Sequence, residues 1–244
     1  MSNGLAARGV LFDLDNTLFD RDRTFLGWAQ WFVRERLHIG EEAGLAATVN
    51  LLVELDANGY GPKDILFQTV KERFPQLAED VHALTTAFYE EHLNYVSLDG
   101  DTELLLNALA GRGIPWGIVT NGSARQMLKV RKLGLDRRTD CVYVSEVVGI
   151  RKPAPEIFLR AAGCLGVEPP EVVFVGDNPE ADIAGAASVG MRTAWLRRGR
   201  EWPPSLASIR PDLILDSLAC LDLSLLPPPA APHTDPHGTR CLDT

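Results

Sequence analysis

The sequence predicts an α/β fold: a parallel sheet with helices on both faces, interrupted after its first strand by an inserted four-helix unit. Beyond residue 99, short apolar runs rich in Val and Ile alternate with helical segments, a pattern typical of βαβ units. Residues 21–95 show little strand-like alternation and carry apolar side chains at helical spacing. The first strand therefore precedes the insertion, and the other strands follow it.

The first strand is expected in GVLFDLDNTLFD, residues 9–20, where acids interrupt an apolar run at Asp13 and Asp15. Apolar side chains then recur every three or four residues within residues 25–32, 45–55, 65–70 and 81–92, which predicts four helices. The turn signal Asn58-Gly59 closes the second of them. A compact unit of four helices is the natural interpretation.

The remaining elements alternate. Helices are expected at residues 101–110, 123–133, 155–165 and 182–189, and strands in IPWGIVTN, CVYVSEVV, EVVFVGD, RTAWLRR and DLILDS. This order assigns residues 1–18 and 97–225 to the α/β core and residues 19–96 to the helical insertion. Residues 226–244 form a Pro-rich tail with too little apolar content to pack, and we expect it to be disordered.

Composition limits the possible partners. The formal charge of −9 over 244 residues argues against nucleic-acid binding, which depends on clustered Lys and Arg. The sequence contains neither a signal-peptide-like segment nor a run of about 18 apolar residues, so we expect no membrane association. Cys141, Cys164, Cys220 and Cys241 show no paired spacing and fit a reducing cytoplasm better than a disulfide scaffold. Nothing in the sequence indicates the oligomeric state.

Polar side chains gather where the predicted strands end. In open parallel sheets, ligands bind outside the carboxyl ends of the strands, so residues placed there can converge on one site. The candidates at these ends are Asp13, Asp15 and Thr17 after the first strand, Thr120, Asn121 and Gly122 after the second, Lys152 in the loop after the third, and Asp177 and Asp182 after the fourth.

This combination suits a phosphate group. Four carboxylates in one crevice would raise each other's pKa unless a cation is present, and Mg²⁺ with oxygen ligands meets that need. Lys152 adds a positive charge, and the N–H groups of Asn121 and Gly122, just before a helix, are placed to hold an anion. Purely structural roles are the alternative: a turn at Asp13 and Asp15, a helix cap at Thr120-Asn121, charge compensation of a helix N-terminus by Asp182, and a solvated Lys152.

The segments FDLDNTLFD, IVTNG, GIRKPAPEIF and VGDNPEADIAGA resemble, in order, the four motifs of the haloacid dehalogenase-like hydrolases. The resemblance covers residues 8 to about 220 and is specific for the superfamily rather than for a substrate. It implies a Rossmann-like core, with the helical insertion in the position of the family's first-type cap. It also implies a phosphatase that uses Mg²⁺ and an aspartyl-phosphate intermediate.

By this resemblance, Asp13 is the nucleophile and Asp15 is the general acid and base, whose main-chain carbonyl also binds the metal. Thr120, Asn121 and Gly122 would hold the phosphoryl oxygens, and Lys152 would neutralise charge. Asp177 would ligate Mg²⁺ directly, with Asp182 assisting. Thr17 would steady the first loop by hydrogen bonding.

Other functions stay open at this point. A phosphomutase shares the four motifs, whereas a metal-independent 2-haloacid dehalogenase typically lacks the acid found here at Asp15. A non-catalytic scaffold is disfavoured because no catalytic position is substituted. A closed cap favours a small phosphorylated metabolite, for which nucleoside monophosphates, sugar phosphates and phosphoglycolate-like acids are comparable candidates.

Overall fold

The computed structural model describes residues 7–225, which contain a six-stranded parallel sheet. The strands are β1 (Gly9–Phe12), β2 (Trp116–Thr120), β3 (Val142–Val144), β4 (Val172–Gly176), β5 (Arg192–Leu196) and β6 (Leu213–Leu215). Their order across the sheet is β3-β2-β1-β4-β5-β6, and every neighbouring pair is parallel. This doubly wound order confirms the predicted Rossmann-like fold class.

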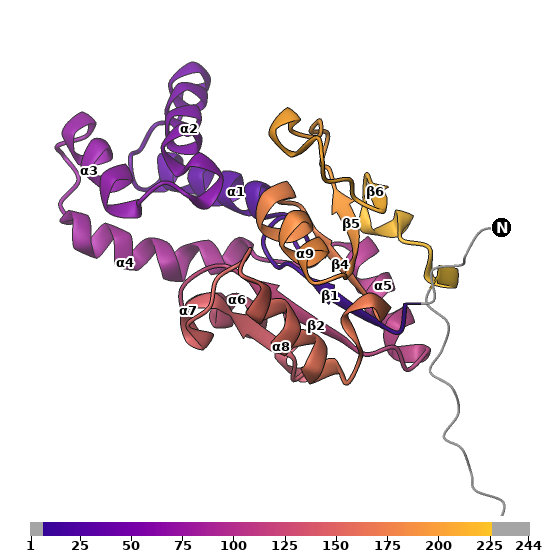
Figure 1. Cartoon of the computed structure of the whole chain (residues 1–244). Coiled ribbons are helices and arrows are strands. Elements are labelled where there is room, and N and C mark those ends of the chain that lie inside the picture. The colour runs from indigo at the N-terminus through magenta and orange to yellow at the C-terminus, as the bar shows by residue number, and fades with distance from the viewer. Residues whose placement is uncertain (1–6, 226–244) are drawn as a thin grey trace, which may run out of the picture.

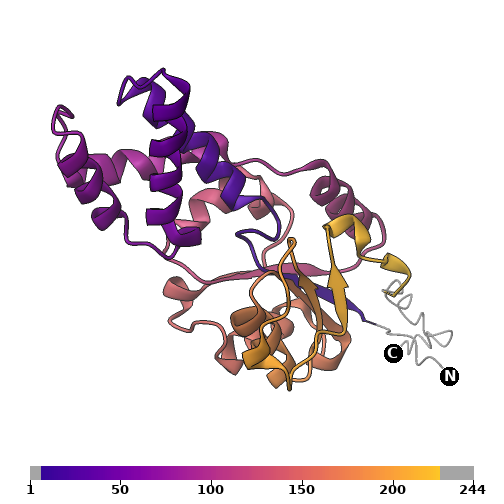
Figure 2. The same ribbon diagram turned by 90° about the horizontal axis from the view of Figure 1, so that it is seen from above.

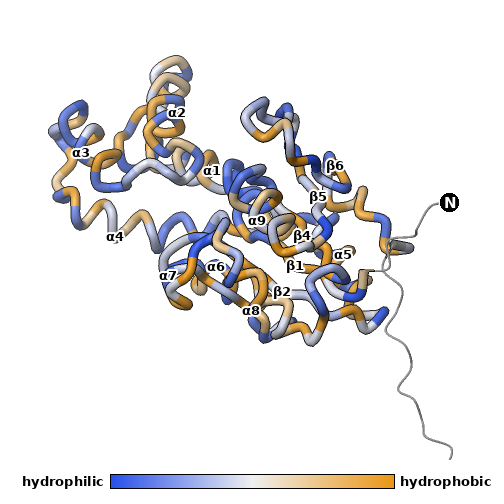
Figure 3. The backbone as a smooth tube through the Cα atoms, viewed as in Figure 1, coloured by the Kyte–Doolittle hydropathy of each residue, from blue (hydrophilic) through white to orange (hydrophobic). Residues whose placement is uncertain are grey.

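Helices cover both faces of the sheet because side chains along each strand alternate between them. Val10 and Phe12 of β1 pack with α5 (Gly100–Gly111) and α6 (Gln126–Lys132). Leu11 points to the opposite face and packs with α8 (Pro155–Leu165) and α9 (Gly185–Ser188). Figure 3 shows hydrophobic tube in the central strands, as expected when both faces are buried.

The inserted helices form a lobe beside the sheet, which we call the cap (Figures 1 and 2). They are α1 (Arg21–Glu35), α2 (Glu42–Asp56), α3 (Lys63–Arg73) and α4 (Val81–Glu91). Their apolar faces enclose a core of their own, separate from the two clusters that flank the sheet. Trp28 lies at its centre, with ring centroids 5.0 Å from Phe32 and 4.7 Å from Phe88.

Two predicted elements differ from the observed ones. The apolar run CVYVSEVV ends as a strand at Val144, and α7 (Ser145–Val148) follows directly. The Ser145 hydroxyl hydrogen-bonds the backbone of Gly122, which draws the chain out of the sheet. The predicted helix at 182–189 begins earlier, as a π-helical turn over Pro179–Ala184, because the Asn178 side chain accepts hydrogen bonds from the N–H groups of Glu180 and Ala181.

The structure contradicts the expectation for two of the cysteines. Cys141, just before β3, and Cys164, in α8, form a disulfide across 23 residues of sequence. Their spacing gave no indication of this, because the pair is created by α8 packing back against the edge of the sheet. Cys220 is a free, exposed thiol.

Within residues 7–225, no helix is long and apolar enough to cross a membrane. The tail predicted over residues 226–244 lies outside the described residues.

Candidate active site

The candidate site lies at the point where the strand order reverses. The chain leaves β1 for β2 on one side of the sheet and reaches β4 on the other, so the carboxyl ends of β1 and β4 border a crevice. Asp13 follows β1 and Asp177 follows β4. The N–H of Asp13 donates to the Val175 carbonyl at 2.9 Å, which fixes the chain at the end of β1.

Three predicted acids come together here. Carboxylate oxygens of Asp13, Asp177 and Asp182 lie within 4.8 Å of one another. The buried Lys152 ammonium lies 2.6 Å from both Asp13 and Asp182 and donates to the Val119 carbonyl at 2.7 Å. The sequence separates these residues by up to 169 positions, and the sheet brings them to one edge.

The electrostatics of the cluster favour an additional cation. Burial raises the pKa of Asp13 well above its usual value; Asp182 and Asp177 raise it further, and Lys152 opposes the rise. Burial and the neighbouring Asp182 raise the pKa of Asp177 to about 6, although Arg200 opposes this. The pKa of Lys152 is raised because its two carboxylates outweigh the effect of burial.

A divalent cation fits this donor set. Mg²⁺ prefers carboxylate, carbonyl and water oxygens, and the three clustered side chains supply carboxylates. The Lys152 ammonium and the Arg200 guanidinium, which is 2.8 Å from Asp177, do not balance three ionised acids. A cation would neutralise the remaining negative charge and lower the pKa of both Asp13 and Asp177. The Asp15 side chain does not belong to this cluster.

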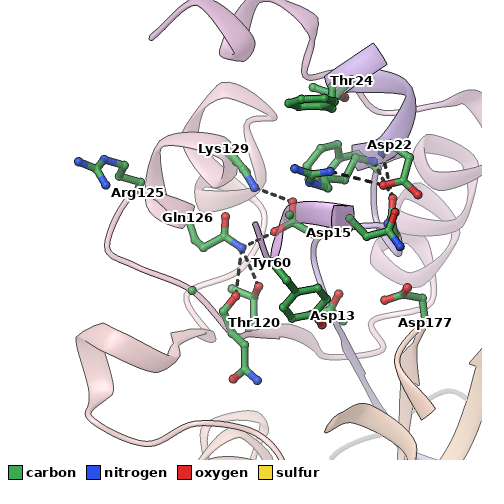
Figure 4. A pocket seen from close by; sticks show the side chains of 18 of the residues that line it. Asp13, Asp15, Asp22, Thr24, Tyr60, Thr120, Arg125, Gln126, Lys129 and Asp177 are labelled. Carbon is green, nitrogen blue, oxygen red and sulfur yellow. Dashed lines mark hydrogen bonds and ion pairs between the residues drawn. The ribbon is translucent and has the colours of Figure 1, made fainter. Parts of the chain in front are cut away.

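Asp15 has partners that the sequence interpretation missed. Lys129 of α6 contacts its carboxylate at 2.6 Å, and the Gln126 side-chain amide donates to the same group (Figure 4). Burial acts to raise the pKa of Asp15, but Lys129 and Gln126 outweigh it and lower the pKa. The one available signal was that Gln126 and Lys129 lie three residues apart on the helix that leaves the site, and therefore share a face.

The predicted phosphate-binding residues differ in the hydrogen bonds that their polar groups already make. Thr120 lines the cavity and its hydroxyl accepts from Gln126 at 3.1 Å. The Asn121 side chain makes two hydrogen bonds of 2.9 Å with the Lys152 backbone and so holds that loop. The N–H of Gly122 already donates to Ser145 at 3.0 Å. The Thr17 N–H donates to the Leu14 carbonyl at 3.3 Å, within the first loop, whereas its buried hydroxyl has no partner in the described part of the chain, so its role stays a prediction.

A cavity of about 610 Å³ separates the acid cluster from the cap. On the cap side, Asp56 is buried and pairs with Arg21 and with Lys63, the latter at 2.9 Å. Burial and the nearby Lys129 lower the pKa of His92 to about 4, so this ring is neutral at pH 7. Tyr60 reaches from the cap to the core, where its hydroxyl accepts from the Asn178 amide at 3.0 Å.

Comparisons with known proteins identify the family of the chain. The model of the haloacid dehalogenase-like hydrolase family matches residues 7–190. The chain is 32% identical to a glyceraldehyde 3-phosphate phosphatase of Methanopyrus kandleri, over 79% of this chain and 85% of that protein. It is also 32% identical to a phosphoserine phosphatase of Thermus thermophilus, over 81% and 78% of the two chains.

Among solved structures, a haloacid dehalogenase-like phosphatase from Thermococcus onnurineus aligns with a TM-score of 0.56 and 27% identity. The alignment covers 86% of this chain and 94% of that one. The chain therefore belongs to the haloacid dehalogenase-like hydrolase family, and within it to the phosphatase branch of phosphoric monoester hydrolases.

Proposed function

We propose that this hydrolase is a Mg²⁺-dependent phosphatase that cleaves a small phosphomonoester through an aspartyl-phosphate on Asp13. The observation that carries the proposal is the cluster of Asp13, Asp177 and Asp182 around Lys152, which lines the cavity between the sheet and the cap. The phosphatases among its relatives support the reaction type.

In the first step, a carboxylate oxygen of Asp13 attacks phosphorus, and the bond to the ester oxygen breaks. Lys152, held by Asn121 and the Val119 carbonyl, offsets negative charge beside the nucleophile. Thr120 and the Asn121 N–H are placed at the end of β2, where they would bind phosphoryl oxygens. Asp15 would give its proton to the departing alkoxide.

In the second step, water attacks the aspartyl-phosphate, Asp15 accepts its proton, and Asp13 leaves as a carboxylate with release of inorganic phosphate. Lys129 and Gln126 stabilise the ionised form of Asp15, the form that this step requires. The first step requires the protonated form. A phosphate group bound near Lys129 would weaken the ion pair between Lys129 and Asp15 and so favour the protonated form of Asp15.

Asp13, Asp177 and Asp182 would hold Mg²⁺, with the Asp15 main-chain carbonyl as a further ligand. When bound, the ion supplies positive charge that stabilises the negative charge developing on the phosphoryl oxygens. Lys152 and Arg200, which pairs with Asp177 at 2.8 Å, cannot balance three acids together with a phosphate dianion.

The cap supports a small substrate. A volume of about 610 Å³ is within the range of small-molecule sites and is walled on one side by the cap. Nucleotides, sugar phosphates and phosphoglycolate-like acids are all candidate substrates. The cationic side chains that line this cavity suit anionic ligands, even though the chain as a whole carries a charge of −9.

The test is phosphate release from a panel of small phosphomonoesters, with Mg²⁺ and with EDTA. We expect Mg²⁺-dependent release by the wild-type protein and none by Asp13→Asn, which lacks the nucleophilic carboxylate. The matched control is Asp64→Asn, an exposed acid on α3 outside the cavity, which should retain full activity.

Turnover by Asp13→Asn at the wild-type rate would contradict the proposal. Interconversion of phosphosugar isomers without phosphate release would identify a mutase instead. Chloride release from a 2-chloro acid without metal would identify a dehalogenase.

A further inference from the structure

Tyr60 is an aromatic side chain of the cap placed directly over the acid cluster. It is 69% exposed and lines the same cavity as Asp13 and Asp177. Figure 4 shows its ring beside Asp13, and its hydroxyl accepts a hydrogen bond from Asn178, the neighbour of Asp177. Tyr60 is thus a point where the cap touches the catalytic edge of the sheet.

The turn that presents Tyr60 is held in a costly conformation. Ala57, Asn58 and Gly59 all have positive φ, at 47°, 54° and 89°, and the first two are not glycine. Such residues persist only where the surroundings fix them. Here Asp56 fixes them, because its buried carboxylate accepts from the Gly59 N–H at 3.0 Å while pairing with Arg21 and Lys63.

The Tyr60 hydroxyl accepts a hydrogen bond but donates none within the described residues. A tyrosine hydroxyl can accept and can donate one proton. Tyr60 accepts from Asn178, but within residues 7–225 its own proton has no acceptor. Tyr60 is exposed and lines the cavity, so a ligand oxygen that displaces solvent there can accept this proton.

We propose that Tyr60 is a specificity-determining residue that donates a hydrogen bond to an oxygen on the leaving group of the phosphomonoester. This inference rests on the proposed function. Core residues surround the phosphoryl position, whereas Tyr60 approaches from the cap, where the leaving group must lie. The preferred substrate class is therefore phosphomonoesters with a hydroxyl or other oxygen acceptor close to the ester carbon.

Binding to the Asp13→Asn variant tests this without requiring turnover. Glycerol 3-phosphate and n-propyl phosphate have the same charge and chain length and differ only in the two hydroxyls. Dissociation constants for both are measured by calorimetry with Mg²⁺, in Asp13→Asn and in Asp13→Asn with Tyr60→Phe. We expect tighter binding of glycerol 3-phosphate, and a loss of about tenfold in that preference when the phenol hydroxyl is removed, as for one hydrogen bond.

Two further variants separate donation to ligand from bridging to the core. Asn178→Ser keeps an acceptor for the helix N-terminus but removes the amide that reaches Tyr60, so the glycerol preference should persist. Tyr95→Phe removes a hydroxyl outside the cavity and should change neither constant.

An unchanged preference in Tyr60→Phe, an equal weakening of both esters, or binding of neither ester to Asp13→Asn would overturn the inference. Wild-type turnover separates it from the proposed function. If no ester is hydrolysed but Tyr60→Phe still changes the preference, the proposed function fails and the role of Tyr60 in binding stands. If esters are hydrolysed and the preference is unchanged, the role of Tyr60 fails alone.

Discussion

Asp13 and Asp15 are two residues apart yet have opposite electrostatic surroundings. Asp13 is buried beside two acids, and burial and these acids raise its pKa although Lys152 opposes the rise. Asp15 is paired with Lys129 and Gln126, which lowers its pKa. Paired carboxylates whose surroundings push their pKa values apart are suited to different roles, which are attack on phosphorus and proton transfer in the proposed mechanism.

Replacement of Lys129 by Met tests the second environment. Without the ammonium, the pKa of Asp15 rises, so the base needed for hydrolysis of the aspartyl-phosphate forms only at higher pH. We expect the acidic limb of the pH–rate profile to move to higher pH and kcat to fall by about ten- to a hundredfold. Lys132→Met, an exposed change at the end of the same helix, should leave the profile in place. An unshifted limb in Lys129→Met would contradict this role.

The raised pKa of Asp177 predicts how pH and metal act together. Its folded value of about 6 exceeds the ordinary 3.8, so between these values the folded state binds more protons than the unfolded state. The stability of the metal-free protein should therefore fall as pH rises through this window, and Asp13 acts in the same direction. Mg²⁺ competes with those protons.

We thus expect the rise in melting temperature caused by Mg²⁺ to be larger at about pH 7.5 than at about pH 5. Thermal unfolding with and without Mg²⁺ at both values measures it. A metal effect that is equal at both, or larger in acid, would argue against Asp177 as a ligand.

At the level of elements, the candidate site residues lie in loops after strands, and links between elements hold neighbouring segments together. The disulfide joins the start of β3 to α8 and encloses α7 and the loop that carries Lys152. In the cap, the Arg21–Asp56–Lys63 group joins α1, the end of α2 and α3. Both links lie outside the acid cluster.

Reduction of the disulfide should lower stability. Closing a loop of 23 residues limits the unfolded chain, which corresponds to about 3 kcal/mol in the chain-entropy model. We expect dithiothreitol, or Cys141→Ser with Cys164→Ser, to lower the melting temperature and Cys220→Ser to leave it unchanged. Thiol titration under denaturing conditions should reveal two additional thiols after reduction. An unchanged melting temperature would contradict a stabilising disulfide.

Much of the candidate site was predictable because its residues lie next to recognisable strands in the sequence. Apolar runs mark the strands, and Asp13, Thr120, Lys152 and Asp177 follow those runs or their loops directly in sequence. The contacts between distant segments were not predictable. Lys129 is 114 residues from Asp15, and Tyr60 is 118 residues from Asn178. Such contacts depend on how separate helices and loops pack, which periodicity does not encode.

At the scale of the whole molecule, the cap and the sheet have separate apolar cores. The cap helices enclose Trp28, Phe32, Phe67 and Phe88, while the sheet has one cluster on each face. Separate cores predict separate units of local unfolding, joined by contacts such as that between Tyr60 and Asn178.

Phe67→Ala tests this separation. Phe67 is fully buried in the cap, so truncation should cost about 3–5 kcal/mol. In hydrogen exchange measured by mass spectrometry, we expect faster exchange across residues 21–95 and little change in β1, β2 and β4. Equal acceleration in both regions would show a single cooperative unit. Leu26→Ala, a more exposed apolar residue on α1, serves as the mild control.

The position of β1 has a consequence for synthesis on the ribosome. It is made first, but it lies in the middle of the sheet, and its partners are β2, where Val10 pairs with Trp116, and β4, where Val10 pairs with Val173. During synthesis this apolar strand therefore stays unpaired until β2 and β4 have been made, while the helices that follow it can assemble from neighbouring residues. The segment that carries Asp13, the proposed nucleophile, is thus among the last to reach its final surroundings.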